Sequence, residues 1–405
     1  MNPWRSLGSL PREVWILFTV TLINRTGTMV LPFLVLYLTE SLKLSPQRAG
    51  LVMVFYGFGA LITAPLAGRL SDRVGALRVM KASLFLSGAT LFVFPFAHGF
   101  IAVVLITVLW AIINEAFRPA SMAIITEAVP AEKRKSAFSL NRLAINLGMS
   151  IGPAAGGFLA AHSFLTLFIV DGATSMIAGI VLAATRWPTK HEDASSETRS
   201  QNDSFATTKR LSVLSDRRFL CFLAVMIPVE IIFFQSQGAM PLYLVRDLKI
   251  SESVFGMLLT INTILIILIE VPLNMAMANW PHRRAVALGA LLTGAGFGAL
   301  AFASNAWGVA ATVIIWTFGE MIIFPSSSAY VADIAPAERR GVYSGLYVMT
   351  FSVAFMIGPW IGLAALEHFG ARLLWVGAFV SGCLSATMIL AMRSFGEKEA
   401  RAAEA

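Results

Sequence analysis

Five charged side chains interrupt long apolar segments of the sequence near the midpoints of those segments. They are Arg25, Glu115, Arg118, Glu230 and Glu320. If such a segment crosses a membrane as a helix, an ionised side chain at its centre costs about 2.5–3.5 kcal/mol, so each charge marks a candidate site. Burial away from water also favours the neutral form of a carboxyl group, which lets it exchange protons near neutral pH. The five charges therefore indicate ion or proton chemistry.

Structural pairing is the alternative interpretation of these charges. Glu115 and Arg118 are three residues apart, so they share one face of a helix and can neutralise each other. Arg25 can neutralise a second carboxylate, which leaves one of the three glutamates unpaired. We favour function over pairing for Glu115, Arg118 and Arg25. For Glu230 and Glu320 both interpretations stay open.

Uncharged polar side chains lie close to the same midpoints. Asn24 and Asn114 directly precede the first arginine and the first glutamate of the set. Gln235 and Gln237 follow Glu230 by five and seven residues, which places them about 7–10 Å further along a helix. We therefore expect these four side chains in the same cavity, the two glutamines as substrate contacts.

Three further charges lie within apolar segments but away from their centres. Asp171 and Glu270 can carry protons, although a hydrogen bond between helices is the simpler interpretation for both. Arg142 lies near the end of its segment, so its long side chain is expected to reach water or to join a gate.

The composition tells us what kind of elements carry these residues. Hydrophobic residues make up 57% of the 405 residues and charged residues 13%, too little charge to cover a soluble protein. Apolar runs long enough to cross about 30 Å of hydrocarbon recur, and they are too long for barrel strands. We predict an all-α membrane protein with twelve spans, at 14–38, 48–68, 77–97, 100–128, 136–160, 163–186, 218–245, 252–278, 284–303, 306–333, 342–366 and 370–393.

The basic residues predict the orientation of these spans. Of 31 Lys and Arg residues, the outside loops would hold Lys43, Arg48, Arg246, Lys249 and Arg372, and the spans Arg25, Arg118 and Arg142. All others lie on the side of the two termini, which the positive-inside rule makes cytoplasmic. The net charge of +8 therefore reflects topology, and we expect no nucleic-acid partner.

The sequence repeats itself after half its length. A shift of 206 residues brings seven similar positions together without a gap. The pairs are Pro119 with Pro325, Glu127 with Asp333, Pro130 with Pro336, Glu132 with Glu338, Arg134 with Arg340, Gly152 with Gly358 and Pro153 with Pro359. Such an offset predicts two similar halves, 1–186 and 218–405, joined by a polar cytoplasmic linker over 187–217.

A turn between the second and third spans carries a recognisable motif. Gly68, Asp72, Arg73 and Gly75 stand in the run GRLSDRVG, in which glycines allow a tight turn. This run resembles the loop signature of the major facilitator superfamily, although Ala76 stands where a basic residue is usual. The resemblance implies two six-helix halves around a central cavity lined by the first, fourth, seventh and tenth spans. It also implies that Asp72 latches a cytoplasmic gate.

The fifth span carries small residues at a spacing suited to close helix packing. They are Gly148, Gly152, Pro153, Gly156 and Gly157. An ordinary packing face is the alternative, but the full combination resembles the antiporter motif of drug–proton exporters in the same superfamily. An arginine that proton antiporters often have early in the fourth span is missing, since Val108 stands there.

Enzyme chemistry has no support in the sequence. The five histidines lie in loops or at span ends, and we find no zinc, ATP or paired-cysteine motif, so we expect no metal and no cofactor. The expected function is proton-coupled export of lipophilic or cationic small molecules by a monomer in the bacterial inner membrane. The alternatives are a metabolite or lipid transporter without proton antiport, and a sensor that transports nothing.

Overall fold

The computed structural model describes residues 10–185, 187, 213, 216–336 and 339–403, and every regular element in this part of the chain is a helix. The N-terminal half comprises α1 (Arg12–Thr26), α2 (Val30–Leu36), η2 (Tyr37–Ser41), α3 (Pro46–Val74), α4 (Ala76–Val93), η3 (Phe94–Phe96), α5 (Phe100–Glu115), α6 (Phe117–Ala128), α7 (Ala131–His162) and α8 (Phe164–Ala184). The C-terminal half comprises α11 (Arg217–Phe233), η5 (Phe234–Gln237), α12 (Ala239–Leu242), η6 (Tyr243–Asp247), α13 (Glu252–Ala276), α14 (His282–Ala299), η7 (Leu300–Phe302), α15 (Ala306–Ile334) and α16 (Arg340–Ala403).

These helices account for the twelve expected spans. Ten segments of the described chain are long and apolar enough to cross a membrane, and the two parts of bent α3 add another. One of the ten, Arg340–Met392, is 53 residues long and turns at Gly370, where φ is 80°, so it consists of two spans. The all-α prediction is therefore confirmed. Most of the expected linker, 187–217, lies outside the described residues, and its boundaries stay a prediction.

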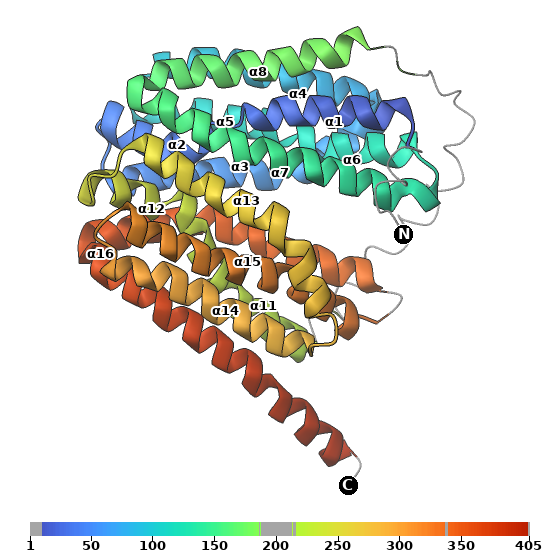
Figure 1. Ribbon diagram of the computed structural model, residues 1–405. Coiled ribbons are helices and arrows are strands. Elements are labelled where there is room, and N and C mark those ends of the chain that lie inside the picture. The colour runs from blue at the N-terminus through green and yellow to red at the C-terminus, as the bar shows by residue number, and fades with distance from the viewer. Residues whose placement is uncertain (1–9, 186, 188–212, 214–215, 337–338, 404–405) are drawn as a thin grey trace.

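The two halves meet closely at only one end of the molecule (Figure 1). We call the end where α1 begins, α8 ends and α11 begins the linker end, and the other the far end. At the far end one apolar core joins both halves, with Phe33 against Phe255 at 5.3 Å and Tyr56 against Phe355 at 5.8 Å between ring centroids. At the linker end each half has a separate core of its own. The molecule is thus closed at the far end.

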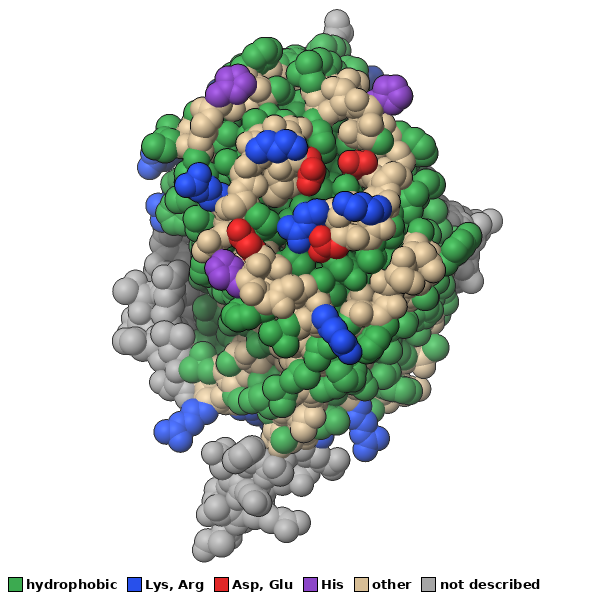
Figure 2. All heavy atoms as spheres, turned by 90° about the vertical axis from the view of Figure 1, so that its left-hand side faces the viewer, with side chains coloured by type: hydrophobic (Ala, Val, Ile, Leu, Met, Phe, Trp, Pro, Cys, Tyr) green, Lys and Arg blue, Asp and Glu red, His purple; other side chains and the backbone are tan. Residues whose placement is uncertain are grey.

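A polar contact also joins the halves at the far end. The Glu367 carboxylate on α16 accepts a hydrogen bond of 2.8 Å from the backbone N–H of Gln47, at the start of α3. Arg246 and Asp247 form an ion pair at 2.7 Å at the same end, but within η6 of the C-terminal half. Figure 2 shows this end with basic and acidic side chains near its middle, surrounded by hydrophobic ones.

Two spans are interrupted where they pass through the shared core. In the first span α1 ends at Thr26 and α2 begins at Val30, and the Asp171 carboxylate accepts hydrogen bonds from the Met29 and Val30 N–H groups at 3.0 and 2.9 Å. These N–H groups have no partner within a helix that begins there, so a carboxylate from α8 stabilises the break. The hydrogen bond expected for Asp171 between helices is confirmed.

Candidate functional site

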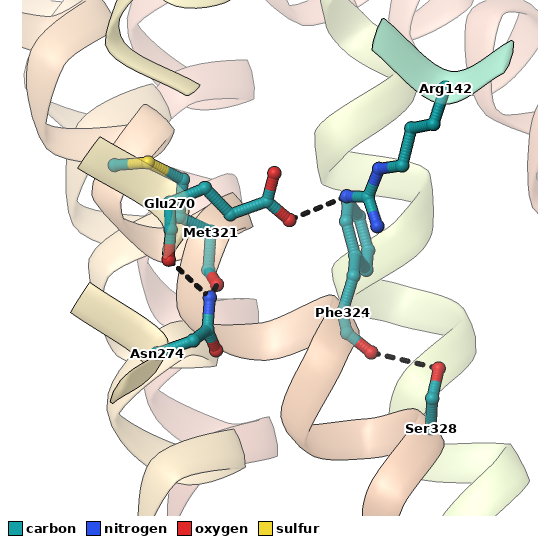
Figure 3. Close-up of polar contacts among 6 residues, drawn as sticks. All are labelled: Arg142, Glu270, Asn274, Met321, Phe324 and Ser328. Atoms are coloured by element: carbon teal, nitrogen blue, oxygen red, sulfur yellow. Dashed lines mark hydrogen bonds and ion pairs between the residues drawn. The ribbon is translucent and has the colours of Figure 1, made fainter. Parts of the chain in front are cut away.

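A cavity of about 350 Å³ lies between the halves, among α7, α13 and α15. Its wall includes Arg142 from the N-terminal half and Glu270 and Glu320 from the C-terminal half, with Asn146 and Phe324. The Arg142 and Glu270 side chains form an ion pair across the cavity, with 2.6 Å between Nη2 and Oε1 (Figure 3). One basic and two acidic side chains therefore share one space between the halves.

The Arg142–Glu270 pair is held more firmly on one side than on the other. The Arg142 side chain is 65% exposed, whereas that of Glu270 is 14% exposed. In Figure 3 Asn274 lies one turn from Glu270 and donates hydrogen bonds to the carbonyls of Glu270 and Met321 at 2.8 and 3.2 Å, which ties α13 to α15. The glutamate is thus fixed in its half, while the arginine extends from the other half and can leave. The contact at Glu270 is an ion pair between the halves, in place of the simple interhelix hydrogen bond expected.

Glu320 is positioned by a side chain that the sequence did not suggest. Asn262 on α13 donates a 2.9 Å hydrogen bond to Glu320 and a 3.0 Å hydrogen bond to the Thr317 hydroxyl. Asn262 thereby fixes the carboxylate that faces the cavity, and leaves its other oxygen available to a ligand or a proton.

The carboxylate of the N-terminal half is held differently. The Tyr56 hydroxyl donates to Glu115 at 2.9 Å and accepts from the Asn114 amide at 3.2 Å. Asn114 in turn accepts from Ser87 at 3.5 Å, and Trp110 donates to Ser87 at 3.1 Å. Tyr56 is fully buried in the shared core. The network ties α3, α4 and α5 together, so Glu115 and Asn114 have partners before any ligand arrives.

The pair between Glu115 and Arg118 that the alternative interpretation allowed does not form. No ion pair joins these two side chains, both of which lie in the described part of the chain. The Arg25 guanidinium lies over the Phe117 ring, at 5.7 Å from its centroid. The Nε atom of Arg25 is buried and donates no hydrogen bond within the described structure. Within the described structure, Arg25 therefore forms no ion pair with a carboxylate.

Glu230 lies outside the cavity, contrary to expectation. It is fully buried between α11 and α16, where Thr350 donates to Oε1 at 2.9 Å and Oε2 has no partner among the described residues. The midpoint of a span gives the depth of a residue, whereas its position around the helix decides what it faces. The counterpart of Glu230 by the 206-residue shift, Asn24, is also buried.

Gln235 has a packing role that replaces the expected contact with substrate. Its amide donates to the carbonyls of Ile231 and Gly358 at 2.9 and 2.8 Å, which ties the segment before the break at Gly238 to α16. Gly362 leaves room for the same amide, since an added Cβ would overlap it. Gln237 lies in η5 and is partly exposed. Gln235 is thus buried outside the cavity.

The loop motif adopts the expected turn. Gly75 has a φ of 94°, which an L side chain rarely adopts, and it ends α3 and begins α4. Asp72 and Arg73 are exposed, and neither forms an ion pair within the described chain. Gly68 has open space around it. The latch role that the resemblance implies for Asp72 stays a prediction.

The glycine motif of α7 packs on two neighbours at once. Cβ atoms at Gly148, Gly152 and Gly156 would run into Arg25, Thr28 and Met29, so this face makes room for the broken first span. A Cβ at Gly157 would come 2.5 Å from the Glu252 carbonyl of α13, in the other half. The expected packing face is present, and it joins the halves.

We call the contact of α7 with α13 around Pro153 and Gly157 the seam. Hydroxyl groups of α13 donate hydrogen bonds to carbonyls of α7 there. A proline has no N–H, so the carbonyl of Met149, four residues earlier, loses its helical partner. Thr263 donates to this carbonyl at 3.4 Å, and Thr260 donates to the Ser150 carbonyl at 2.8 Å. Hydroxyl groups of the C-terminal half thus complete a helix of the N-terminal half.

Comparison with known proteins agrees with this architecture. The family model of the Major Facilitator Superfamily matches residues 16–245 and 231–405, so the chain belongs to that superfamily of membrane transporters. It is therefore a transporter and not an enzyme.

Relatives cover nearly the whole chain at low identity. An uncharacterised MFS-type transporter of Bacillus subtilis, YqjV, is 25% identical over 94% of this chain and 92% of its own length. A Na⁺, Li⁺, K⁺/H⁺ antiporter of Planococcus maritimus is 23% identical, and the quinolone resistance protein NorA of Staphylococcus aureus 22%, each over 88% of this chain and 90% of the relative. The crystal structure of the nucleoside transporter NupG superimposes with a TM-score of 0.78 at 13% identity, over 94% of this chain and 99% of that one, and shows the shared fold.

Proposed function

We propose that the protein exports lipophilic, cationic small molecules across the bacterial inner membrane in exchange for protons. The linker end faces the cytoplasm in this proposal, because the basic residues gather there. The structure then corresponds to the state in which the cavity opens to the cytoplasm. The proton gradient supplies the energy, no cofactor takes part, and the working unit is the monomer.

The observation that carries the proposal is the cavity with two carboxylates and one arginine between separable halves. A cationic ligand favours the ionised form of Glu320, whereas a proton neutralises it, so the two compete for one carboxylate. Such competition yields exchange, since the cavity releases one species only when it takes up the other. Asn262 holds the carboxylate in place in both cases.

Aromatic rings beside the cavity suit a lipophilic ligand. Phe324 lines the cavity and contacts Phe233 at 5.1 Å and Phe351 at 4.9 Å between ring centroids. A flat apolar cation can lie against these rings while its charge points to Glu320. Trp316 takes no part, because it is buried and stacked on Phe297 at 5.3 Å.

The Arg142–Glu270 pair provides the coupling to movement. It joins α7 and α13 while the linker end is open, and a proton or a cation at Glu270 weakens it. The same two helices also meet at the seam around Gly157 and Pro153. When the ion pair weakens, only the seam still holds α7 to α13, so the helices can move more easily. The relatives named for antiport and for quinolone resistance are consistent with this mechanism.

Flux measurements test the proposal. The purified protein is reconstituted in liposomes, and movement of lipophilic cations, neutral compounds and anions is followed with and without an imposed pH gradient. We expect cations to move only when the gradient drives them. Flux that ignores the gradient would point to a metabolite or lipid transporter without proton antiport, and the missing arginine at Val108 is the feature that favours that alternative. No flux for any compound would indicate a sensor.

A further inference from the structure

A second hollow, of about 920 Å³, lies at the linker end within the C-terminal half. It is bounded by the start of α11, the turn before α14 and the end of α15. Its basic wall residues are Arg218, His282, Arg283 and Arg284. It lies in one half only and takes no part in the cavity between the halves.

The hollow occupies the place where the N-terminal half has its loop motif. The 206-residue shift sets Ala278 on Asp72 and Pro281 on Gly75, so the acidic residue and the glycine of the motif are both lost. Arg283 takes the place of Leu77, and the basic residue Arg78 is kept as Arg284. Arg69 and Arg73 are lost as well, because Met275 and Asn279 take their places, so the net charge of the loop is unchanged. What differs is the arrangement: no acidic residue remains, and the two basic residues Arg283 and Arg284 stand side by side at the start of α14.

The acidic residues of the hollow have their own partners. Asp216 accepts from the Phe219 N–H at 3.0 Å and from the Tyr343 hydroxyl at 2.7 Å. Asp333 lies 3.4 Å from the His282 ring. By contrast, neither Arg218 nor Arg284 forms an ion pair within the described part of the chain.

Arg218 is already oriented towards the hollow. Its Nε donates to the Tyr330 hydroxyl at 3.3 Å, and its guanidinium lies 5.9 Å from the centre of the same ring. This contact uses one of five N–H donors, so the others stay available for an acceptor. A held guanidinium is pre-organised for two-point recognition of an anion.

We propose that this hollow binds a phosphate group, and specifically the phosphate of an anionic phospholipid headgroup. Guanidinium groups from two helices match the geometry of phosphate oxygens, which accept hydrogen bonds in pairs. Trp280 on the rim is 47% exposed at the end of a span, where tryptophan belongs at the headgroup level of a bilayer. A soluble phosphate compound offers the same chemistry, so the experiment has to separate the two sources.

Lipid binding to the full-length protein in neutral detergent tests the proposal. Retention of phosphatidylglycerol and of phosphatidylcholine is measured by native mass spectrometry, in the wild type and in Arg284→Gln. We expect the wild type to retain phosphatidylglycerol preferentially, and the variant to bind it about fivefold more weakly, as expected for one arginine near a lipid surface. Thermal unfolding without lipid should be unchanged, because Arg284 is exposed.

Arg78→Gln is the matched control, because it removes one positive charge at the equivalent place in the other half. Unchanged phosphatidylglycerol binding in this control supports the site. Equal loss in both variants would overturn it, since the binding would then reflect general surface charge. Inorganic phosphate that stabilises the wild type, displaces no lipid and has no effect on Arg284→Gln would assign the hollow to a soluble phosphate and overturn the lipid source. No lipid preference and no phosphate effect would overturn the site altogether.

Discussion

The two halves make the same polar contact with different side chains. In the N-terminal half Tyr56 on α3 bonds to Asn114 on α5, and in the C-terminal half Asn262 on α13 bonds to Glu320 on α15. The 206-residue shift sets the first pair directly on the second. The contact that joins two helices has been kept, while its chemistry has changed from neutral to acidic.

The surroundings of the two contacts differ in what they leave available. Tyr56 lies fully buried in the core shared by the halves, and it occupies Glu115 as well as Asn114. Glu320 lies at the wall of a cavity, with one oxygen not used by Asn262. In the proposed mechanism the first contact serves stability and the second serves exchange.

Neutralising Glu320 and Glu115 in turn is the strongest test of this difference between the halves. Glu320→Gln should reduce transport driven by a pH gradient to background, because the amide cannot bind a proton and attracts no cation. Glu115→Gln should keep transport within a few-fold, since the amide oxygen still accepts from Tyr56. Flux in proteoliposomes, with equal amounts of folded protein, measures both. The opposite ranking would return the exchange role to Glu115.

The next largest effect is expected from Gly256 and Gly50, which lie at equivalent positions of the α13–α7 and α3–α16 interfaces between the halves. A Cβ at Gly256 would overlap the Pro153 carbonyl of α7, whereas one at Gly50 would lie 2.8 Å from the Trp360 Cα of α16. We expect Gly256→Ala to destabilise the contact between halves by about 1–3 kcal/mol, with Gly50→Ala at the low end of that range. Thermal unfolding and transport rate measure the difference. Equal effects would show that the two interfaces tolerate bulk alike.

A smaller effect is expected at the proline seam. Thr260 corresponds to Val54 by the shift, so Thr260→Val gives α13 the residue that α3 already has. It removes the hydrogen bond of 2.8 Å to the Ser150 carbonyl, worth about 0.5–1.5 kcal/mol. Cysteine pairs or spin labels across the far end should report a larger open population. Val54→Thr is the reciprocal control, and an unchanged population in Thr260→Val would remove the seam from the mechanism.

Much of this architecture could be predicted from the sequence, because it follows from local patterns. The spans follow from hydropathy, the Gly75 turn from a motif, and the glycine face of α7 from spacing along one helix. The candidate site was less predictable. The pattern favoured Glu115 over Glu320 and placed Glu230 in the cavity, because a midpoint gives depth and not direction.

Contacts between distant segments had only one signal in the sequence. Arg142 and Glu270 are 128 residues apart, and only tertiary packing brings them together. Tyr56 and Asn262 each look ordinary in an apolar span. The repeat could have found them, because the shift that aligns Asn114 with Glu320 also aligns Tyr56 with Asn262. A polar pair kept at both copies is a stronger signal than either residue alone.

The Arg142–Glu270 pair is the one charged contact described between α7 and α13, and it carries the smallest expected effect. Arg142 is largely exposed, so water and salt reduce the strength of the pair to about 0.2–1 kcal/mol. Arg142→Ala and Glu270→Ala should each reduce the population of molecules that are open at the linker end, by up to about fivefold. Accessibility of a cysteine placed in the cavity measures that population, at low and at high salt.

Exchanging the two charges separates attraction from side-chain shape. In Arg142→Glu with Glu270→Arg the pair can form again, so the double variant should regain part of the open population that either single exchange loses. Its transport should nevertheless stay low, because the exchange moves a carboxylate to α7, away from Glu320 and Asn262 on the C-terminal half. Recovery of the population without recovery of transport would show that the pair has two roles, holding the halves and supplying a carboxylate to the cavity. Recovery of both the open population and transport would show that the Arg142–Glu270 pair only holds the halves together. Glu320 alone would then carry the exchange.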